Sequence, residues 1–441
     1  MDSHVERWEM QRRRFLQAAM ATGGALTLGS GFWSRVLAGE LAVAGPGPYG
    51  PLGAPDANGI RLPEGFTSRT IAESLQPVAG APLLGLWHVS PDGAATFATD
   101  DGGWVYVCNS EAPVIGGVNA LRFDASGTVV DGYPILRGTS VNCAGGSTPW
   151  GTWLSCEEFD LTDVGGPAGQ VWECDPTGPG QGLPRPALGK FNHEAVAVDP
   201  VHHHLYLTED QGDGLLYRFT PTTWRDDGVG VLDSGLLEAA VVGVNGKVTW
   251  RPVPDPSAAS GATRDQVPGA TRFNGGEGAW YDDRTVYFTT KGDKRVWALN
   301  TKTRRVKVLY DATPIGPDAP TPLSVDNVTV SPAGDVLVAE DSSTRKRILL
   351  LAEVGDVVTA SPFLEVVERD GGSELTGPVF DPSGTRLYFS SQRGASIRDG
   401  EKEITRTVEE LGLDAVTDAL PIAPLTHRGI TYEVKGPFRQ G

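Results

Sequence analysis

Thiol and carboxylate side chains recur along this chain where short apolar segments end. In residues 151–158, an alternating apolar stretch ends in Cys156, Glu157 and Glu158. Strict alternation predicts a half-buried strand, and thiolates and carboxylates are common metal ligands. This stretch therefore predicts a buried strand that leads directly into metal-ligating side chains.

The same pattern returns five more times. The neighbouring segments end in Glu111, Asp210, Lys291, Glu340-Asp341 and Gln392. Successive segments are about 50 residues apart, except for one longer step, and such a repeat with several short strands is typical of a propeller blade. The central apolar residues of the six segments are Tyr106, Trp153, Tyr206, Tyr287, Leu337 and Tyr388. We therefore predict an all-β fold, a six-bladed β-propeller.

A single propeller domain is expected over residues 45–441, with insertions near 220–272 and 401–418. Residues 66–72 read as a strand that pairs with the last strand, 429–434. Joining the first and last segments in one blade would remove an open sheet edge.

Polar residues also precede a second series of short apolar segments. His193, Glu194, Glu277, Asp326 and Asn327 stand at such positions. The innermost strand of each blade lines the axis of a propeller, so these residues are expected to converge near the mouth of the central channel. Oxygen ligands suit calcium, whereas added cysteine and histidine ligands suit iron or zinc.

The composition narrows the function further. The formal net charge of −18 over 441 residues argues against nucleic acid and anionic membrane surfaces as partners. No run of 18 apolar residues occurs, so an ordinary membrane span is not expected. The four cysteines support no particular disulfide, and the His202–His204 run is interpreted as an exposed turn.

The N-terminus has the form of a twin-arginine signal peptide. Arg12 and Arg13 are followed by one further residue and then Phe15-Leu16, and 42–44 offers a small-residue cleavage site. Residues 1–44 are therefore expected to direct export by the twin-arginine translocation machinery to the periplasm or the medium. The alternative is a short basic amphipathic helix in a cytoplasmic protein.

Several of these segments resemble the PhoX-type alkaline phosphatases. The most specific is 151–158; the shorter ones are 109–111, 191–194, 235–239 and 326–327. The resemblance implies a propeller that carries a cluster of iron and calcium ions with a thiolate iron ligand. It implies iron ligation by Cys156, Glu194, Glu277 and Asp326. It implies that the residues near or binding calcium are Glu111, Glu157, Glu158, Asp210 and Asn327.

Two positions depart from the family pattern. Gly275 stands where the family has an arginine that meets the phosphate, and Ser110 stands where it usually has a histidine. Arg272 and Lys291 are the candidates to supply the missing catalytic positive charge.

The sequence thus favours an exported, monomeric, metal-dependent phosphoesterase that hydrolyses a small phosphorylated substrate. Clustered cations would polarise the phosphoryl oxygens, so no amino-acid nucleophile is needed. A calcium-dependent propeller lactonase or esterase, and a non-enzymatic binding module stabilised by calcium, remain alternatives.

Overall fold

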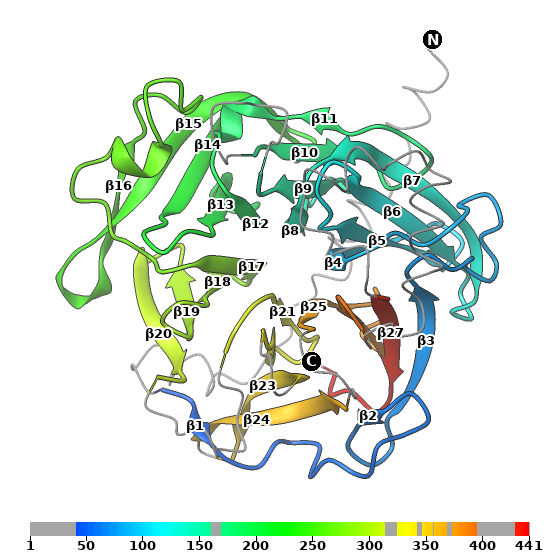
Figure 1. Cartoon of the computed structure of the whole chain (residues 1–441). Coiled ribbons are helices and arrows are strands. Elements are labelled where there is room, and N and C mark those ends of the chain that lie inside the picture. The colour runs from blue at the N-terminus through cyan, green and yellow to red at the C-terminus, as the bar shows by residue number, and fades with distance from the viewer. Residues whose placement is uncertain are drawn as a thin grey trace.

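Six sheets, antiparallel except for one short parallel pairing in the fifth, surround a central axis in the computed structural model (Figure 1). The structure describes residues 41–159, 169–313, 324–341, 346–355, 357–367, 373–394 and 428–440. Within these ranges the regular elements are strands and three short 3₁₀ turns, with no α-helix. The predicted six-bladed β-propeller is confirmed.

Each blade starts at the axis and proceeds outward. Blade 1 contains β4 (Pro91–Ala98), β5 (Trp104–Ser110), β6 (Gly116–Phe123) and β7 (Val129–Thr139). Blade 2 contains β8 (Asn142–Ser147), β9 (Trp153–Glu157), β10 (Val171–Cys174) and β11 (Leu183–Pro184). Blade 3 contains β12 (His193–Asp199), β13 (His204–Glu209), β14 (Leu216–Trp224), β15 (Gly230–Val242) and β16 (Val248–Pro252).

The other half of the ring follows the same order. Blade 4 contains β17 (Gly276–Asp282), β18 (Thr285–Thr290), β19 (Arg295–Asn300) and β20 (Arg305–Asp311). Blade 5 contains β21 (Val328–Val330), β22 (Val336–Ala339), β23 (Lys346–Val354) and β24 (Val357–Val366). Blade 6 contains β25 (Leu375–Phe380), β26 (Arg386–Ser391), β27 (Ile430–Lys435) and, from the other end of the chain, β3 (Thr67–Glu73).

The apolar residues that mark the repeat occupy equivalent strands. All six lie on the second strand of their blade and are buried: Tyr106, Trp153, Tyr206, Tyr287, Leu337 and Tyr388. Their side chains fill the space between neighbouring blades; the rings of Tyr106 and Tyr388, for example, have centroids 5.1 Å apart. The roughly 50-residue repeat therefore reflects the buried second strand of each blade, with Tyr106 and Trp153 packing against the preceding blade and the other four against the following one.

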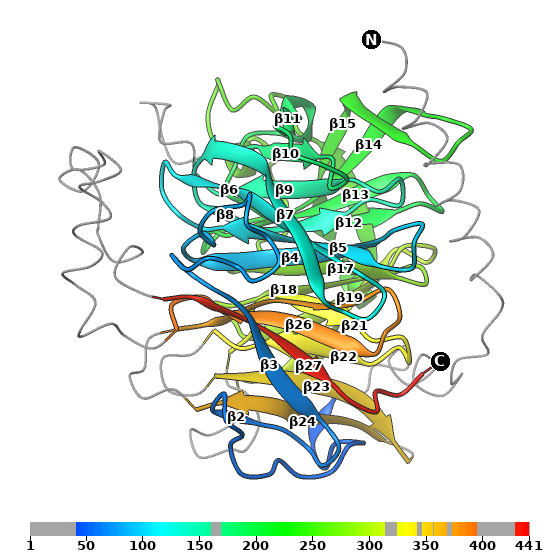
Figure 2. The same cartoon turned by 90° about the vertical axis from the view of Figure 1, so that its right-hand side faces the viewer.

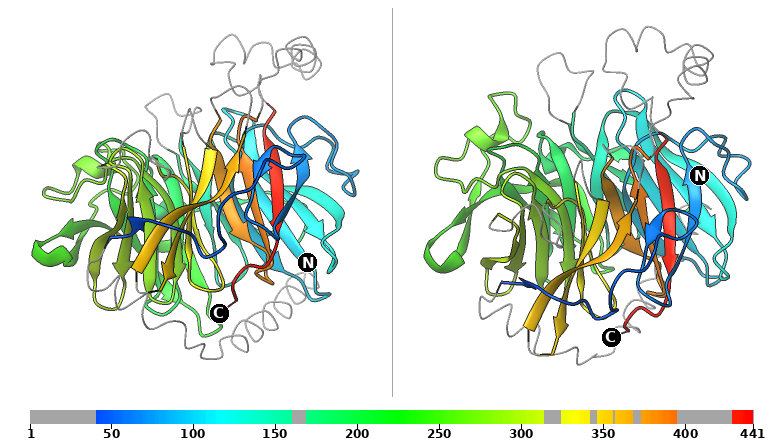
Figure 3. Two further views of the ribbon diagram at one scale, coloured as in Figure 1. Left: turned by 90° about the horizontal axis from the view of Figure 1, so that it is seen from below. Right: turned by 60° about the horizontal axis from the view of Figure 1, so that its bottom comes forward.

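The two ends of the described chain close the ring. Strand β3 pairs antiparallel with β27, as predicted (Figure 2). Before β3, β1 (Val43–Ala44) and β2 (Ile60–Arg61) both pair with β24, so the N-terminal segment covers the outer edge of blade 5 (Figure 3). Both contacts give hydrogen-bond partners to strand edges that would otherwise be open.

Small residues let the innermost strands approach one another at the axis. A Cβ atom at Gly93 would lie 2.4 Å from Ala144 Cα, and one at Gly278 would lie 2.5 Å from Asn327 Cα. Glycine is therefore required at both positions, because a larger side chain would push neighbouring blades apart. The axial cavity that remains is narrow, about 90 Å³.

The predicted insertion near 220–272 contributes β16, a fifth strand on the outside of blade 3. Directly after the insertion, Phe273 N donates to Gly214 O at 2.8 Å, in the loop between β13 and β14. The predicted insertion near 401–418 and residues 1–40 of the predicted signal peptide lie outside the described residues. The helices found in the described residues are too short to span a bilayer.

Candidate metal centre

Bulges at the start of the innermost strands aim side chains at one mouth of the channel. The pairing of the first two strands shifts register after Pro91, Asn142, His193, Gly276 and Thr376, at the same place in five blades. A bulge bends a strand locally and redirects its side chains. The resulting inner set, one residue per blade, is Asp92, Cys143, Glu194, Glu277, Asp326 and Thr376.

A second set of side chains follows the second strand of each blade. Because the first two strands are antiparallel, the end of the second lies beside the start of the first, at the same mouth. This outer set is Glu111, Glu158, Asp210, Lys291, Asp341 and Gln392. The two sets place acidic, thiol, amide and ammonium groups from all six blades around one opening.

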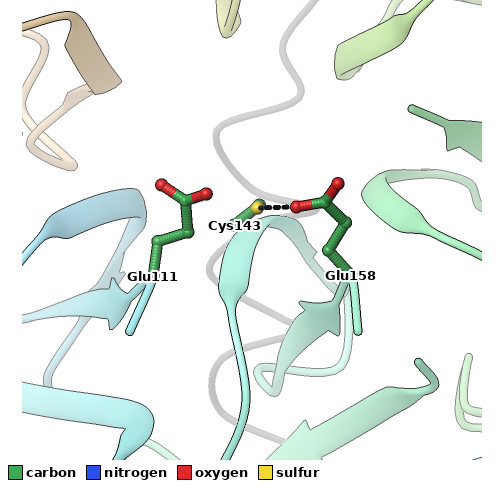
Figure 4. A group of neighbouring side chains, drawn as sticks. All are labelled: Glu111, Cys143 and Glu158. Carbon is green, nitrogen blue, oxygen red and sulfur yellow. Dashed lines mark hydrogen bonds between the residues drawn. The ribbon is translucent and has the colours of Figure 1, made fainter. Parts of the chain in front are cut away.

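Glu111, Cys143 and Glu158 form the first group with ligand atoms close enough to share an ion (Figure 4). One ligand atom of each lies within 4.8 Å of the others. The Cys143 thiol lies between the two carboxylates and donates to Glu158 Oε2 at 3.4 Å. The group joins blades 1 and 2. It contains one soft donor, the thiol, and two hard donors, the carboxylates.

Two further groups contain oxygen donors only. Glu194, Glu277 and Asp326 bring blades 3, 4 and 5 together, and all three are buried. Asp326 also belongs to a group with Asp341 and Glu374, again with ligand atoms within 4.8 Å of one another. Asp326 therefore links two neighbouring groups that can each surround a cation.

Burial and mutual repulsion raise the pKa of these acids. Desolvation raises the pKa of Glu111 and Glu158 to about 7 and that of Glu374 to about 8, with neighbouring carboxylates adding to each shift. The same causes hold the pKa of Glu194 and Glu277 well above the usual range for glutamate. Such a cluster is costly to ionise unless cations neutralise it.

The cluster also raises the pKa of the Cys143 thiol well above its ordinary value. Burial is the main cause, and Glu111, Glu194 and Glu158 add repulsion. The thiol therefore stays protonated unless a metal ion binds it, since metal binding deprotonates a coordinating thiol.

Few protein groups offset the negative charge. Lys291 Nζ lies 2.7 Å from Asp210 Oδ2 and 2.7 Å from Glu277 Oε1. Gln392 Nε2 donates to Asp92 Oδ2 at 2.8 Å and also to Glu111 Oε2, and Arg393 pairs with Glu374 at 3.3 Å. The acids at the mouth are Asp92, Glu111, Glu158, Glu194, Asp210, Glu277, Asp326, Asp341 and Glu374. Metal cations fit this donor set, because the acids outnumber their basic partners in the described part of the chain.

The structure places Cys156 elsewhere. Cys156 lies in the regular part of β9 and is fully buried among apolar residues, including Leu154 and Val171. Burial alone raises the pKa of its thiol, with no carboxylate contributing. Alternation along β9 puts Cys156 on the same face as Leu154, towards blade 3, and the cysteine that the structure brings to the mouth is Cys143.

Four other predicted site residues also lie apart from these groups. His193 Nε2 is hydrogen-bonded to Gly189 O at 3.0 Å, and its ring packs against Phe191. Glu157 accepts hydrogen bonds from Ser140 N at 2.9 Å and Trp172 Nε1 at 3.3 Å. Asn327 Oδ1 accepts from Gly377 N at 2.6 Å and thereby connects blades 5 and 6. Arg272 Nη1 donates to Asp213 O at 2.8 Å, and its side chain remains largely exposed. Of the two predicted catalytic cations, the structure brings only Lys291 to the mouth.

Sequence reasoning missed Asp92, Cys143, Asp341 and Glu374 as site residues. A usable signal existed for two of them, since Cys143 precedes Glu158 by 15 residues and Asp326 precedes Asp341 by 15, close to the 16 between Glu194 and Asp210. Asp92 does not follow this spacing, because its hairpin is longer and Asp92 precedes Glu111 by 19 residues.

Comparison with known proteins supports the motif resemblance. Residues 116–315 match the model of the family described as "Alkaline phosphatase PhoX", while no curated protein matches the chain. The fold is similar to that of Pseudomonas fluorescens PhoX in complex with vanadate, a transition state analogue, with a TM-score of 0.62, 16% sequence identity, and coverage of 90% of this chain and 98% of that chain. A gluconolactonase from Xanthomonas campestris, XC5397, has a TM-score of 0.44 at 12% identity, covering 89% of this chain and 99% of that chain. The family match thus confirms, over residues 116–315, the resemblance of this chain to the PhoX-type alkaline phosphatases.

Proposed function

We propose that this protein is an exported, metal-dependent phosphomonoesterase of the alkaline phosphatase type. The observation that carries the proposal is the convergence of three groups of buried and half-buried carboxylates and one thiol at a single mouth, in a chain whose residues 116–315 match the PhoX family. The structure of P. fluorescens PhoX, which shares the fold, holds vanadate, an analogue of the transition state for phosphoryl transfer.

The donor chemistry of each group suggests its metal. The Cys143 thiolate is the soft donor of the site, so we assign iron to the group of Glu111, Cys143 and Glu158, with Glu194 nearby. The all-oxygen group of Asp326, Asp341 and Glu374 suits calcium, which prefers carboxylate ligands. The Glu194, Glu277 and Asp326 group joins these two regions and would complete the cluster.

Bound cations would polarise the phosphoryl oxygens and offset the charge that develops in the transition state. The protein's own contribution is to position them. Bulged backbone holds Cys143, Glu194 and Glu277 at fixed places around the mouth, and Lys291 adds a positive charge at its partly exposed rim. A phosphomonoester dianion is attracted more strongly by such a site than a diester, which carries less charge.

Export by the twin-arginine route is part of the proposal. Arg12-Arg13 provide the signal, and this route carries folded proteins with metals already bound. The periplasm or the medium is then the place where phosphate is released from small phosphorylated molecules.

The test is an assay of protein purified from its exporting host with its native metals. We expect hydrolysis of p-nitrophenyl phosphate with a kcat/KM at least ~100-fold above that for bis(p-nitrophenyl) phosphate. Chelation should abolish the activity, elemental analysis should find iron and calcium, and vanadate should inhibit. Hydrolysis of δ-gluconolactone without phosphatase activity, or full activity in metal-free protein, would overturn the proposal.

A further inference from the structure

The group of Glu111, Cys143 and Glu158 has a counterpart two blades further round the ring. The first group combines the outer-set residue of blade 1 with the inner-set and outer-set residues of blade 2. The same three positions in blades 3 and 4 hold Asp210, Glu277 and Lys291. The counterpart positions therefore hold two acids and, where the first group has Glu158, a lysine.

Lys291 bridges the two remaining acids of this counterpart group. Its Nζ lies 2.7 Å from Asp210 Oδ2 in blade 3 and 2.7 Å from Glu277 Oε1 in blade 4. One positive charge thus joins carboxylates from adjacent blades, as a metal ion shared by Glu111, Cys143 and Glu158 would do at the equivalent position. A lysine amine ordinarily carries a positive charge at neutral pH, and both of its partners here are acids.

The backbone is shaped to let the lysine side chain reach this place. Lys291 N donates to Gly275 O at 2.8 Å, and a Cβ atom on Gly275 would lie 3.0 Å from Lys291 Cγ. The aliphatic part of Lys291 therefore rests against a residue that has no side chain.

Neighbouring arginines in the described residues point to other partners. Arg264 pairs with Glu209 at 3.2 Å and with Asp213 at 3.0 Å, and Arg272 binds the main chain of Asp213. Within the described chain, the positive charge between Asp210 and Glu277 comes from Lys291.

We infer that the Lys291 ammonium is a built-in cation that occupies the place of a metal ion between Asp210 and Glu277. This inference rests on the proposed metal-dependent function, and it defines how that site is loaded. The position between Asp210 and Glu277, where blades 3 and 4 meet, therefore takes no metal ion of its own. Glu277 contacts the ammonium and also binds the ion held with Glu194 and Asp326. The ammonium therefore stands where Asp210 and Glu277 could otherwise share an ion.

The test measures the number of bound ions per chain rather than catalytic activity. Lys291→Glu restores a third acid to the counterpart group, and Lys291→Met removes the ammonium while leaving Asp210 and Glu277 in place. Protein loaded in excess calcium is dialysed to equilibrium, and metal per chain is measured by elemental analysis. We expect Lys291→Glu to bind one more divalent ion per chain than the wild type, and Lys291→Met to bind the same extra ion more weakly.

Lys302→Glu is the matched control, because Lys302 is exposed in a turn of blade 4 away from the mouth and the substitution changes the net charge equally. The inference is overturned if folded Lys291→Glu and Lys291→Met bind the same number of ions as the wild type and the control. It is also overturned if neither variant folds in excess calcium, since calcium should replace the lost ammonium.

The result separates this inference from the proposed function. An extra ion in Lys291→Glu, together with a wild type that hydrolyses no phosphomonoester, would support the built-in cation and refute the phosphatase. A wild type that hydrolyses phosphomonoesters, together with an ion count that the Lys291 substitutions leave unchanged, would support the phosphatase and refute the built-in cation.

Discussion

The thiol of Cys143 donates to Oε2 of Glu158 across 3.4 Å and thereby connects the first two strands of blade 2 at the mouth of the channel. The contact depends on the bulge between Asn142 and Gly145, which turns Cys143 out of the regular alternation of β8. Cys156, on the paired strand β9, keeps that alternation and packs into the core. Two cysteines on adjacent strands therefore have different roles.

Replacing these two cysteines separately should distinguish their roles. Cys143→Ser should lose iron and at least ~100-fold in kcat, because the sulfur is the soft donor beside Glu111 and Glu158. Cys156→Ser should keep metal and activity but lose about 1–3 kcal/mol of unfolding free energy, because it buries a hydroxyl among apolar side chains. Elemental analysis, kinetics and denaturation of both variants provide the measurement. Loss of metal and activity in Cys156→Ser but not in Cys143→Ser would show that Cys156 is the metal ligand.

Glu194→Gln should weaken the centre without unfolding the ring. The amide keeps the shape of the side chain but removes a charge from the group with Glu277 and Asp326. We expect a loss of bound metal and a fall in kcat of at least ~100-fold, with an unchanged circular dichroism spectrum. Glu365→Gln, on the outer strand of blade 5, is the control and should match the wild type. Retained metal in Glu194→Gln would argue against this group.

The metal-free protein should lose thermal stability as the pH rises. Glu111 and Glu158 have a pKa of about 7 in the folded chain and Glu374 about 8, all above the ordinary 4.5. The folded state then binds protons that the unfolded state releases, so these groups stabilise the fold below about pH 4.5 and this stabilisation is lost as the pH rises through 7 to 8. Melting temperatures of chelator-treated protein should therefore fall between pH 5 and 8.5.

Adding iron and calcium should flatten that decline, because the cations neutralise the ionised acids. In the metal-free protein, Glu111→Gln should reduce the fall in melting temperature with pH, because it removes one of the titrating groups. A melting temperature that rises from pH 5 to 8.5 without metal would contradict this account of the cluster.

Placing an arginine at Gly275 should not improve the enzyme. The sequence resemblance suggests that this substitution would restore a phosphate-binding side chain, but Gly275 has φ of +68° and its Cβ position faces Lys291 Cγ at 3.0 Å. Gly275→Arg should cost about 1–2 kcal/mol for the left-handed backbone alone and should displace Lys291. Gly50→Arg, at φ +86° with open space around it, is the control for the backbone cost. Faster turnover in Gly275→Arg would show that the position tolerates the arginine.

Export should depend on the twin arginines, and the exported chain should retain β1. Replacing Arg12 and Arg13 by lysine should leave the precursor in the cytoplasm, whereas Arg14→Lys should not. The predicted cleavage site at 42–44 falls on β1, where Val43 and Ala44 pair with Thr359 and Ala360 and Ala42 N donates to Leu309 O at 2.8 Å. A peptidase acting on the folded protein finds this segment protected, so N-terminal sequencing of the exported form should give a start before Leu41. A start at Gly45 would show that β1 is dispensable.

The sequence by itself determined the architecture. Alternating segments centred on Tyr106, Trp153 and their four counterparts mark the buried second strand of each blade, and local alternation is enough to reveal it. Closure of the ring by β3 and β27 could also be predicted, because a strand pattern at each terminus has a free edge to pair with. The acids that follow the second strands, such as Glu111 and Glu158, could be predicted because the local alternating pattern shows where each of these strands ends.

Only the tertiary structure decided which of these side chains meet. Whether Cys143 or Cys156 reaches the mouth depends on a single-residue bulge, and moving one residue along a strand turns a side chain to the other face. The neighbours of Glu277 come from blades 3 and 5, so their proximity depends on how the sheets pack around the axis. Lys291 could be read as a strand-end residue, but its contact with both Asp210 and Glu277 exists only because adjacent blades bring those carboxylates to the same ammonium.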